Sequence, residues 1–329
     1  MPPATVNETL QELPNMTSMT PRVREILGYY AGENPGVLSN IARILMHGRL
    51  GGTGKVLILP VDQGFEHGPA RSFWKNPAAY DPRYHFHLAI KAGLSAYAAP
   101  LGMLEAGAAE FAGQIPLILK CNSSDLHARS KDQAVHGSVR DALRLGCSAI
   151  GFTIYPFADD QFAMMEELSA LALEAKANGL AVVCWSYPRG GVLSKEGETA
   201  LDITAYAAHL AAELGAHIIK VKPPSGTIFA EDDKDTKAAY ADGNWGDSQL
   251  STRAAHVLQA AFNGRRIVIF SGGPAKGDEE VLEEVRQLAL GGGFGNIIGR
   301  NAFTRKEDEA LQLLGQAISI LQEASKGAA

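Results

Sequence analysis

The chain has 329 residues, of which 46% are hydrophobic and 20% are charged, and its net charge is −6. This balance is typical of a globular protein with one large domain or two ordinary ones, and it provides ample apolar material for a core. The sequence has no basic block that would indicate nucleic-acid binding, and no apolar stretch approaches the length of a membrane span.

Three cysteines, Cys121, Cys147 and Cys184, lie far apart and lack the spacing of metal ligands. Because their number is odd and each lies in or near an apolar run, we expect buried free thiols in a reducing compartment. The first 20 residues are polar and include Glu8 and Glu12, which is unlike a secretory signal. The sequence therefore predicts a cytoplasmic protein.

The first fifty residues carry two segments with apolar positions at helical spacing, residues 21–30 and 35–46. Asn34 is suited to cap the second helix, and Pro35 fits its first turn. From residue 51 onward the pattern changes to a regular alternation of short apolar runs and longer helix-like segments. The predicted strands are residues 56–61, 95–99, 117–121, 149–153, 181–185, 217–221, 267–270 and 296–298. The predicted helices between them are residues 132–145, 160–178, 199–214, 248–262, 278–290 and 305–323.

Eight strands with intervening helices predict an α/β fold, a (β/α)8 TIM barrel over residues 51–329 with an N-terminal helical extension over residues 1–50. A doubly wound open sheet would give a similar pattern. However, no glycine-rich dinucleotide fingerprint follows any early strand. In a barrel of this kind the chemistry belongs at the carboxyl ends of the strands, so the residues there are the candidates for a site.

The sixth predicted strand is the strongest of these candidates, because it ends in Lys220-Val221-Lys222 before two prolines. Side chains alternate along a strand, so both lysines are expected on one face. Burial and mutual repulsion would lower the pKa of Lys220, which an amine needs in order to attack a carbonyl near neutral pH. Lys220 lies deeper and should be the nucleophile, whereas Lys222 at the rim should stay charged. The alternative is that both lysines simply reach solvent past the strand end.

Other strand ends carry further polar and aromatic residues. Asp62 follows the first strand, where it is either a functional carboxylate or an ordinary turn residue. Lys120 ends the third strand. Trp185 and Tyr187 share a face after the fifth strand, where they either plug the barrel or, for Tyr187, exchange protons with a substrate. His67, His85 and His87 are the candidates for zinc binding, but they lack a convincing third ligand and the spacing of a zinc site.

The last two strands end in glycine-containing turns. Residues 271–274 read Ser-Gly-Gly-Pro and residues 298–301 read Ile-Gly-Arg-Asn. Backbone amides at Gly272, Gly273 and Gly299 could converge on an anion, with Ser271 beside them and Arg300 adding charge. The loops after strands seven and eight are where such barrels often bind phosphate.

Taken together, the sequence resembles the class I fructose-bisphosphate aldolases of the archaeal and bacterial type, which form a Schiff base and need no metal or other cofactor. The resemblance runs from about residue 56 to the carboxyl terminus. It departs from the archaeal pattern at Gln63 and in a longer, more acidic stretch over residues 223–245. The motifs that carry it are residues 61–68, 185–190, 217–222, 271–274 and 298–301.

The resemblance implies that Lys220 forms the Schiff base, that Tyr187 shuttles protons and that Asp62 takes part in carbinolamine chemistry. It also implies a sugar phosphate as substrate. Barrels of this kind generally associate, so we expect a homo-oligomer. Lys222, Trp185, Ser271, Gly272, Gly273, Gly299, Arg300 and Lys120 are the candidate substrate-binding residues. Two alternatives stay open: a related Schiff-base lyase or transferase acting on another ketose phosphate, and a barrel that binds a sugar phosphate without catalysis.

Overall fold

The computed structural model describes residues 19–128, 131–230, 233–243, 245, 248–272 and 276–326. Within these residues a closed barrel of eight parallel strands forms, and the strands follow one another around it in chain order. The first and last strands close the barrel, with Val56 paired to Gly295 and Ile58 to Ile297. The barrel strands are β1 (Val56–Pro60), β2 (Ala96–Pro100), β3 (Leu117–Lys120), β6 (Ala149–Ile154), β7 (Ala181–Ser186), β8 (Ile218–Val221), β9 (Ile267–Ser271) and β10 (Gly295–Ile297).

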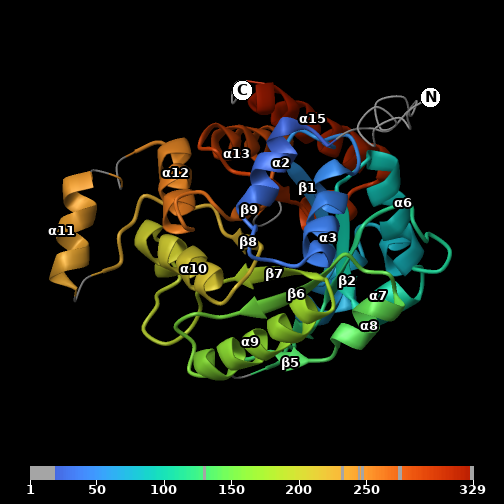
Figure 1. Cartoon of the computed structure of the whole chain (residues 1–329), viewed down its shortest axis with the longest axis horizontal. Coiled ribbons are helices and arrows are strands. Elements are labelled where there is room, and N and C mark those ends of the chain that lie inside the picture. The colour runs from blue at the N-terminus through green and yellow to red at the C-terminus, as the bar shows by residue number, and fades with distance from the viewer. Residues whose placement is uncertain are drawn as a thin grey trace, which may run out of the picture.

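The predicted (β/α)8 barrel is therefore confirmed, and each predicted strand lies within about two residues of an observed one. Strands buried on both faces explain this accuracy, since they appear in the sequence as continuous apolar runs. Helices cover the outside of the barrel (Figure 1). The longer ones in the described part are α2 (Pro21–Gly28), α3 (Pro35–Met46), α6 (Pro82–Ala92), α9 (Gln161–Ala177), α10 (Leu201–Glu213), α11 (Lys234–Gly243), α12 (Leu250–Ala260), α13 (Asp278–Leu290) and α15 (Glu307–Lys326).

The segment between β3 and β6 differs from the prediction of one helix over residues 132–145. Residues Ala134–Val135 instead form a short strand, β5, that pairs with β4 (Asn122–Ser123). The helix α8 (Val139–Arg144) begins only after Ser138, whose side chain and Asp141 form a reciprocal capping box. The helices α6 and α11 were not predicted. The remaining short elements are α4 (Gln63–His67), α5 (Pro69–Phe73), η1 (Pro77–Tyr80), α7 (Leu101–Glu105), η2 (Gly197–Thr199) and α14 (Arg300–Phe303).

The helices α2 and α3 pack at the amino-terminal end of the barrel strands. Tyr30, which follows α2, is 3% exposed, and its hydroxyl donates a hydrogen bond of 2.6 Å to the carbonyl oxygen of His217. The same hydroxyl accepts a hydrogen bond of 2.9 Å from the amide of Ile267. These two backbone groups lie at the starts of β8 and β9, so Tyr30 joins the N-terminal helices to the end of the barrel that lies opposite the strand tips.

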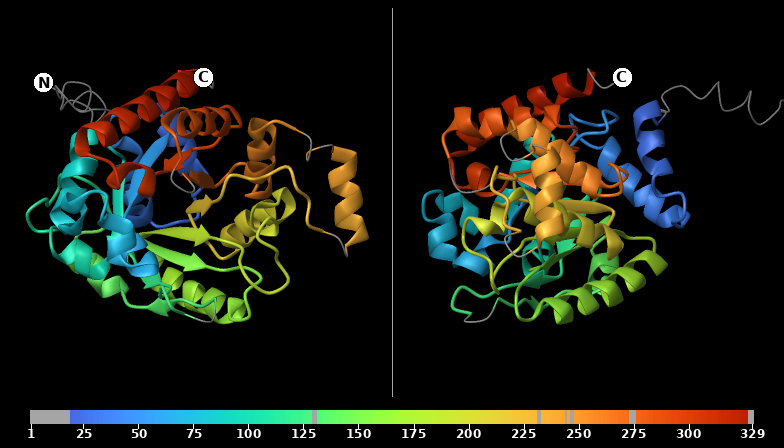
Figure 2. Two further views of the ribbon diagram at one scale, coloured as in Figure 1. Left: turned by 180° about the vertical axis from the view of Figure 1, so that it is seen from behind. Right: turned by 90° about the vertical axis from the view of Figure 1, so that its left-hand side faces the viewer.

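The helix α11 stands away from the barrel at one side of the molecule, as Figures 1 and 2 show. The loop that leads to it from β8 is fixed on the start of α10: the carboxylate of Asp202 accepts hydrogen bonds from the amides of Phe229 and Ala230. Within the part of the chain that the structure describes, none of the helices combines the length and the apolar character that a membrane crossing requires.

Candidate active site

A cavity of about 440 Å³ lies at the carboxyl ends of the barrel strands, where the fold places the chemistry of such proteins. It is bordered by residues that follow β1, β7, β8, β9 and β10, which are far apart in the sequence. Eight of the residues singled out from the sequence line it: Asp62, Tyr187, Lys220, Lys222, Ser271, Gly272, Gly299 and Arg300. Gly273 lies outside the described residues, so the structure gives no placement for it.

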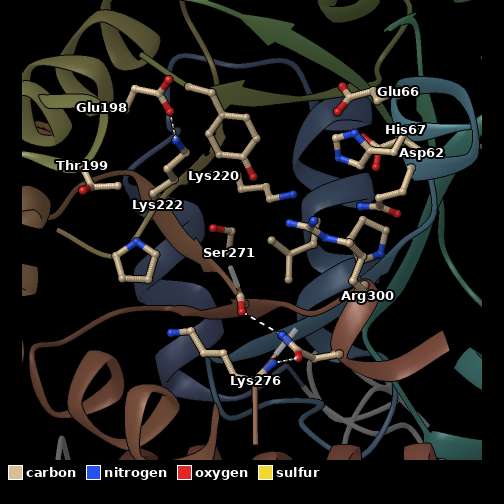
Figure 3. Close-up of a pocket in the computed structure, with 18 of the residues that line it drawn as sticks. Asp62, Glu66, His67, Glu198, Thr199, Lys220, Lys222, Ser271, Lys276 and Arg300 are labelled. Atoms are coloured by element: carbon tan, nitrogen blue, oxygen red, sulfur yellow. Dashed lines mark hydrogen bonds and ion pairs between the residues drawn. The ribbon is translucent and has the colours of Figure 1, made fainter. Parts of the chain in front are cut away.

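Lys220 is the central residue of the cavity. It is the third residue of β8, it is 5% exposed, and its amine extends toward the side of the cavity that carries Asp62 and Arg300 (Figure 3). Burial lowers the pKa of Lys220 to about 8; nearby Asp62 and Glu66 raise it in part, and Lys120 and Arg300 lower it further. An amine with such a pKa is partly neutral near pH 7 and can act as a nucleophile.

Tyr187 and Asp62 border the same part of the cavity as Lys220. The Nζ atom of Lys220 lies 5.3 Å from the centre of the Tyr187 ring. Burial raises the pKa of Tyr187 well above its usual value, so the phenol keeps its proton and can donate it. Asp62 directly precedes the short helix α4 and is 7% exposed. The site thus brings together a nucleophilic amine, a proton donor and a carboxylate.

Lys222 lies just beyond the end of β8 and takes a different direction from Lys220 (Figure 3). Its Nζ atom is 2.7 Å from an Oε atom of Glu198, which also binds Lys195 at 2.9 Å. Burial opposes ionisation of Glu198, but the hydrogen bonds from the two lysines lower its pKa overall. The expectation that Lys222 lowers the pKa of Lys220 is therefore not supported. Glu198 balances the charge of Lys222. The cations that lower the pKa of Lys220 are instead Lys120 and Arg300.

The loops after β9 and β10 meet at the opposite wall of the cavity. The side chain of Asn301 donates to the carbonyl oxygen of Gly272 at 2.8 Å and accepts from the amide of Lys276 at 3.0 Å. Gly299 lies so close to β1 that an added Cβ atom would be 2.6 Å from the carbonyl oxygen of Pro60. Only glycine therefore lets the loop after β10 pass so close to β1. The same loop brings Arg300 to the cavity.

Trp185 and Lys120 do not line the cavity but lie buried beneath it, each 1% exposed. Trp185 directly adjoins Lys220 across the β7–β8 pair. The indole has room because residue 151 is glycine: a Cβ atom there would be 2.3 Å from Trp185. Substrate contact by Trp185 or Lys120, which was expected from the sequence, has no support in this arrangement.

Several residues of the cavity were not assigned a role from the sequence. Glu66 and His67 lie on α4 beside Asp62. Burial, together with the Asp62 carboxylate, raises the pKa of Glu66, and burial with nearby arginines lowers that of His67. Arg189 also lines the cavity, where its guanidinium is 4.7 Å from the centre of the Tyr155 ring. Their sequence signal was their position three to seven residues after the end of a strand.

Metal binding finds no support in the side chains that the structure describes, since no group of three or more His, Cys, Asp or Glu residues is arranged to hold an ion. His85, which the sequence places near His67, is completely buried, and one ring nitrogen lies 2.8 Å from the carbonyl oxygen of Ala79. The three cysteines are buried free thiols, as expected.

A parallel eight-stranded barrel with a buried, partly neutral lysine at the strand ends defines a Schiff-base lyase site. The sequence profile of the DeoC/LacD family aldolases matches residues 56–305. The chain belongs to this family and, within it, to the class 1 fructose-bisphosphate aldolases, as its similarity to curated proteins shows.

The similar proteins cover most of the chain. A probable fructose-bisphosphate aldolase class 1 of Chlamydia muridarum is 35% identical over 297 residues, covering 85% of this chain and 83% of the relative. The fructose-bisphosphate aldolase class 1 of Thermoproteus tenax is 36% identical over 256 residues, covering 77% and 85%. Among solved structures, an archaeal fructose-1,6-bisphosphate aldolase, with its catalytic lysine bound to a carbinolamine intermediate, superposes with a TM-score of 0.71. It is 32% identical and covers 86% of this chain and 99% of its own.

Proposed function

We propose that this protein is a Schiff-base aldolase that cleaves fructose 1,6-bisphosphate to dihydroxyacetone phosphate and glyceraldehyde 3-phosphate, and catalyses the reverse condensation, in glycolysis and gluconeogenesis. The observation that carries the proposal is the environment of Lys220: a buried amine with a pKa of about 8 in a cavity shared with Asp62 and Tyr187. The relatives' names support the choice of substrate.

The chemistry begins when the neutral amine of Lys220 attacks the C2 ketone of the open-chain substrate. Loss of water from the carbinolamine gives an iminium, and Asp62 is placed to move the protons of this step. The iminium accepts the electron pair of the C3–C4 bond, so the bond breaks, an enamine forms and the C4 hydroxyl gives its proton to the Asp62 carboxylate. Tyr187 donates its own proton to C3 and takes the proton held by Asp62 in exchange. Hydrolysis of the new iminium then releases dihydroxyacetone phosphate and restores the amine.

The substrate phosphates require cations or amides at two places. For the phosphate next to the ketone we propose the wall formed by Ser271, Gly272, Gly299 and Arg300, where two loops meet. For the second phosphate we propose Arg189, because its side chain lines the cavity. The side chain of Lys222 can contact a substrate oxygen from the side of Glu198.

We further propose that the predicted N-terminal extension, of which residues 19–50 are described and residues 1–18 lie outside the described part, belongs to a single catalytic barrel that begins at residue 51, and that the protein works in the cytoplasm as a homo-oligomer. The contact of Tyr30 with the strand starts supports the extension, and the buried free thiols support a reducing compartment.

The test combines turnover with trapping. The purified protein should cleave fructose 1,6-bisphosphate, and reduction with cyanoborohydride in the presence of dihydroxyacetone phosphate should modify Lys220 alone, as mapped by peptide mass spectrometry. Lys220→Met should abolish both the cleavage of fructose 1,6-bisphosphate and the formation of the trapped adduct. Lys222→Met is the matched control, since it removes the neighbouring lysine, and it should still trap. An adduct on Lys222 or Lys120 would refute the assignment.

A further inference from the structure

Arg305 is a charged residue close to the site that the proposed chemistry does not use. It lies two residues after α14, and its side chain is 20% exposed. It borders a hollow of about 310 Å³ that shares Lys276 and Asn301 with the catalytic cavity, but it does not line the cavity itself. A side chain in this place can serve the reaction only through the residues that it holds.

The guanidinium of Arg305 contacts segments that follow two different strands. Its Nε atom donates to the carbonyl oxygen of Asn301, after β10, at 2.7 Å. One terminal nitrogen donates to the carbonyl oxygen of Lys276 at 3.2 Å, and the other lies 2.5 Å from a carboxylate oxygen of Asp278. Both of these residues follow β9, so the one side chain ties the segment after β9 to the segment after β10.

Asn301 forms a second bridge between the same two segments, at the wall of the cavity. It is 2% exposed, and its side-chain amide joins the carbonyl oxygen of Gly272 to the backbone amide of Lys276. Because Arg305 holds the backbone of both Asn301 and Lys276, it fixes the origin of this side chain and one of its partners. The contacts therefore run from Arg305 through Asn301 to Gly272, which belongs to the wall proposed for the phosphate.

The three acceptors around Arg305 suit a guanidinium better than any other side chain. A guanidinium has five N–H donors in one rigid plane and no acceptor, whereas the ammonium of a lysine carries the same charge at a single point. The Asp278 side chain is 48% exposed, and an ion pair at such a position contributes little by itself. The two carbonyl contacts are therefore the ones that hold the segments, and experiments can separate them from the charge.

We propose that Arg305 is a positioning residue for phosphate recognition: it holds the segments after β9 and β10 where Gly272, Gly299 and Arg300 converge on the substrate phosphate. This inference rests on the proposed function and adds to it a residue that does not touch the substrate. Binding groups must be held within a fraction of an ångström of their working positions, so loss of the bridge should weaken the phosphate contacts. The sequence placed Arg305 only at the start of the helix predicted over residues 305–323.

Two ketones separate phosphate recognition from imine formation. Dihydroxyacetone phosphate and dihydroxyacetone form the same imine with Lys220, but only the first has a phosphate to bind. In Arg305→Ala, cyanoborohydride trapping at low concentrations of dihydroxyacetone phosphate should slow about tenfold, whereas trapping of dihydroxyacetone should stay within about twofold of wild type. Arg305→Lys keeps the charge without the planar fork and should lose at least about threefold, with the phosphorylated ketone alone.

Arg286→Ala is the matched control. Arg286 pairs with Glu283 at 2.7 Å on the exposed side of α13, the helix that Asp278 begins, and it contacts neither of the two bridged segments through a listed carbonyl of Lys276 or Asn301. This variant should trap both ketones at the wild-type rate.

Four results would overturn the inference. Equal losses with both ketones would show a purely structural role, and wild-type rates in both Arg305 variants would show that the bridge is not needed. A wild-type rate in Arg305→Lys with a loss in Arg305→Ala would show that the charge acts without the fork. Failure of both variants to fold, judged by circular dichroism, while Arg286→Ala folds would make Arg305 a residue of the fold alone. The absence of any adduct on Lys220 in wild type would instead refute the proposed function, together with this inference.

Discussion

Replacing Tyr30 by phenylalanine removes one hydroxyl from the amino-terminal end of the barrel and should destabilise the fold without affecting the site. The hydroxyl makes two buried hydrogen bonds, to the carbonyl oxygen of His217 and from the amide of Ile267. Each buried hydrogen bond contributes about 1 kcal/mol, and a group left unpaired costs more. Here the Ile267 amide also reaches the His217 carbonyl oxygen at 3.2 Å, so neither group is left entirely alone. We therefore expect a loss of about 2 kcal/mol in the free energy of unfolding.

Urea denaturation followed by circular dichroism measures this loss, and the slope of the transition should be unchanged. Tyr29→Phe is the matched control, because the Tyr29 hydroxyl donates to Glu25 at an exposed position. Its loss should change the free energy of unfolding by less than about 0.5 kcal/mol. Equal stability of the two variants would refute the reasoning, as would a loss of imine trapping in folded Tyr30→Phe, since the hydroxyl lies at the end of the barrel opposite Lys220.

Two further predictions concern the chemistry. Cleavage of fructose 1,6-bisphosphate should survive exhaustive chelation, because the iminium on Lys220 supplies the electron sink that a metal would otherwise provide; loss of activity with EDTA that zinc or cobalt restores would contradict the mechanism. Tyr187→Phe should fold normally and still trap the imine but turn over about 100-fold more slowly, since it lacks the proton that the phenol donates; steady-state kinetics at the wild-type rate would make Tyr187 a packing residue.

The sequence predicted the strands well because they are buried on both faces, and it placed Lys220 by its position at a strand end. It could not show which partner each lysine would find. Glu198 lies on the short helix η2, more than twenty residues before Lys222 in the chain, and only the folded structure brings the two together. The burial of Trp185 beside Lys220 was hidden for the same reason, because the indole occupies space left free by Gly151 on another strand.

The helix predicted over residues 132–145 was wrong in its first part because that part pairs with another segment of the chain. Its first part has a helix-compatible composition, but Ala134 and Val135 pair with residues 122–123, and the capping box at Ser138 defines a later start. Tertiary pairing here overrides the local preference. The helix α6 could have been found, since Asp81 caps it and Pro82 occupies its first turn, which are ordinary start signals.

The closure of the barrel between β1 and β10 has a consequence for how the protein is made. Val56 pairs with Gly295, so the seam cannot form until the chain through Gly295 has left the ribosome. Until then β1 and the most recently added strand expose unpaired edges, which are the surfaces on which nascent chains aggregate. Tyr30 cannot dock earlier either, because its partners at the starts of β8 and β9 are synthesised about two hundred residues later. Closure of this barrel therefore waits for the synthesis of β10, and the docking of Tyr30 waits for that of β9.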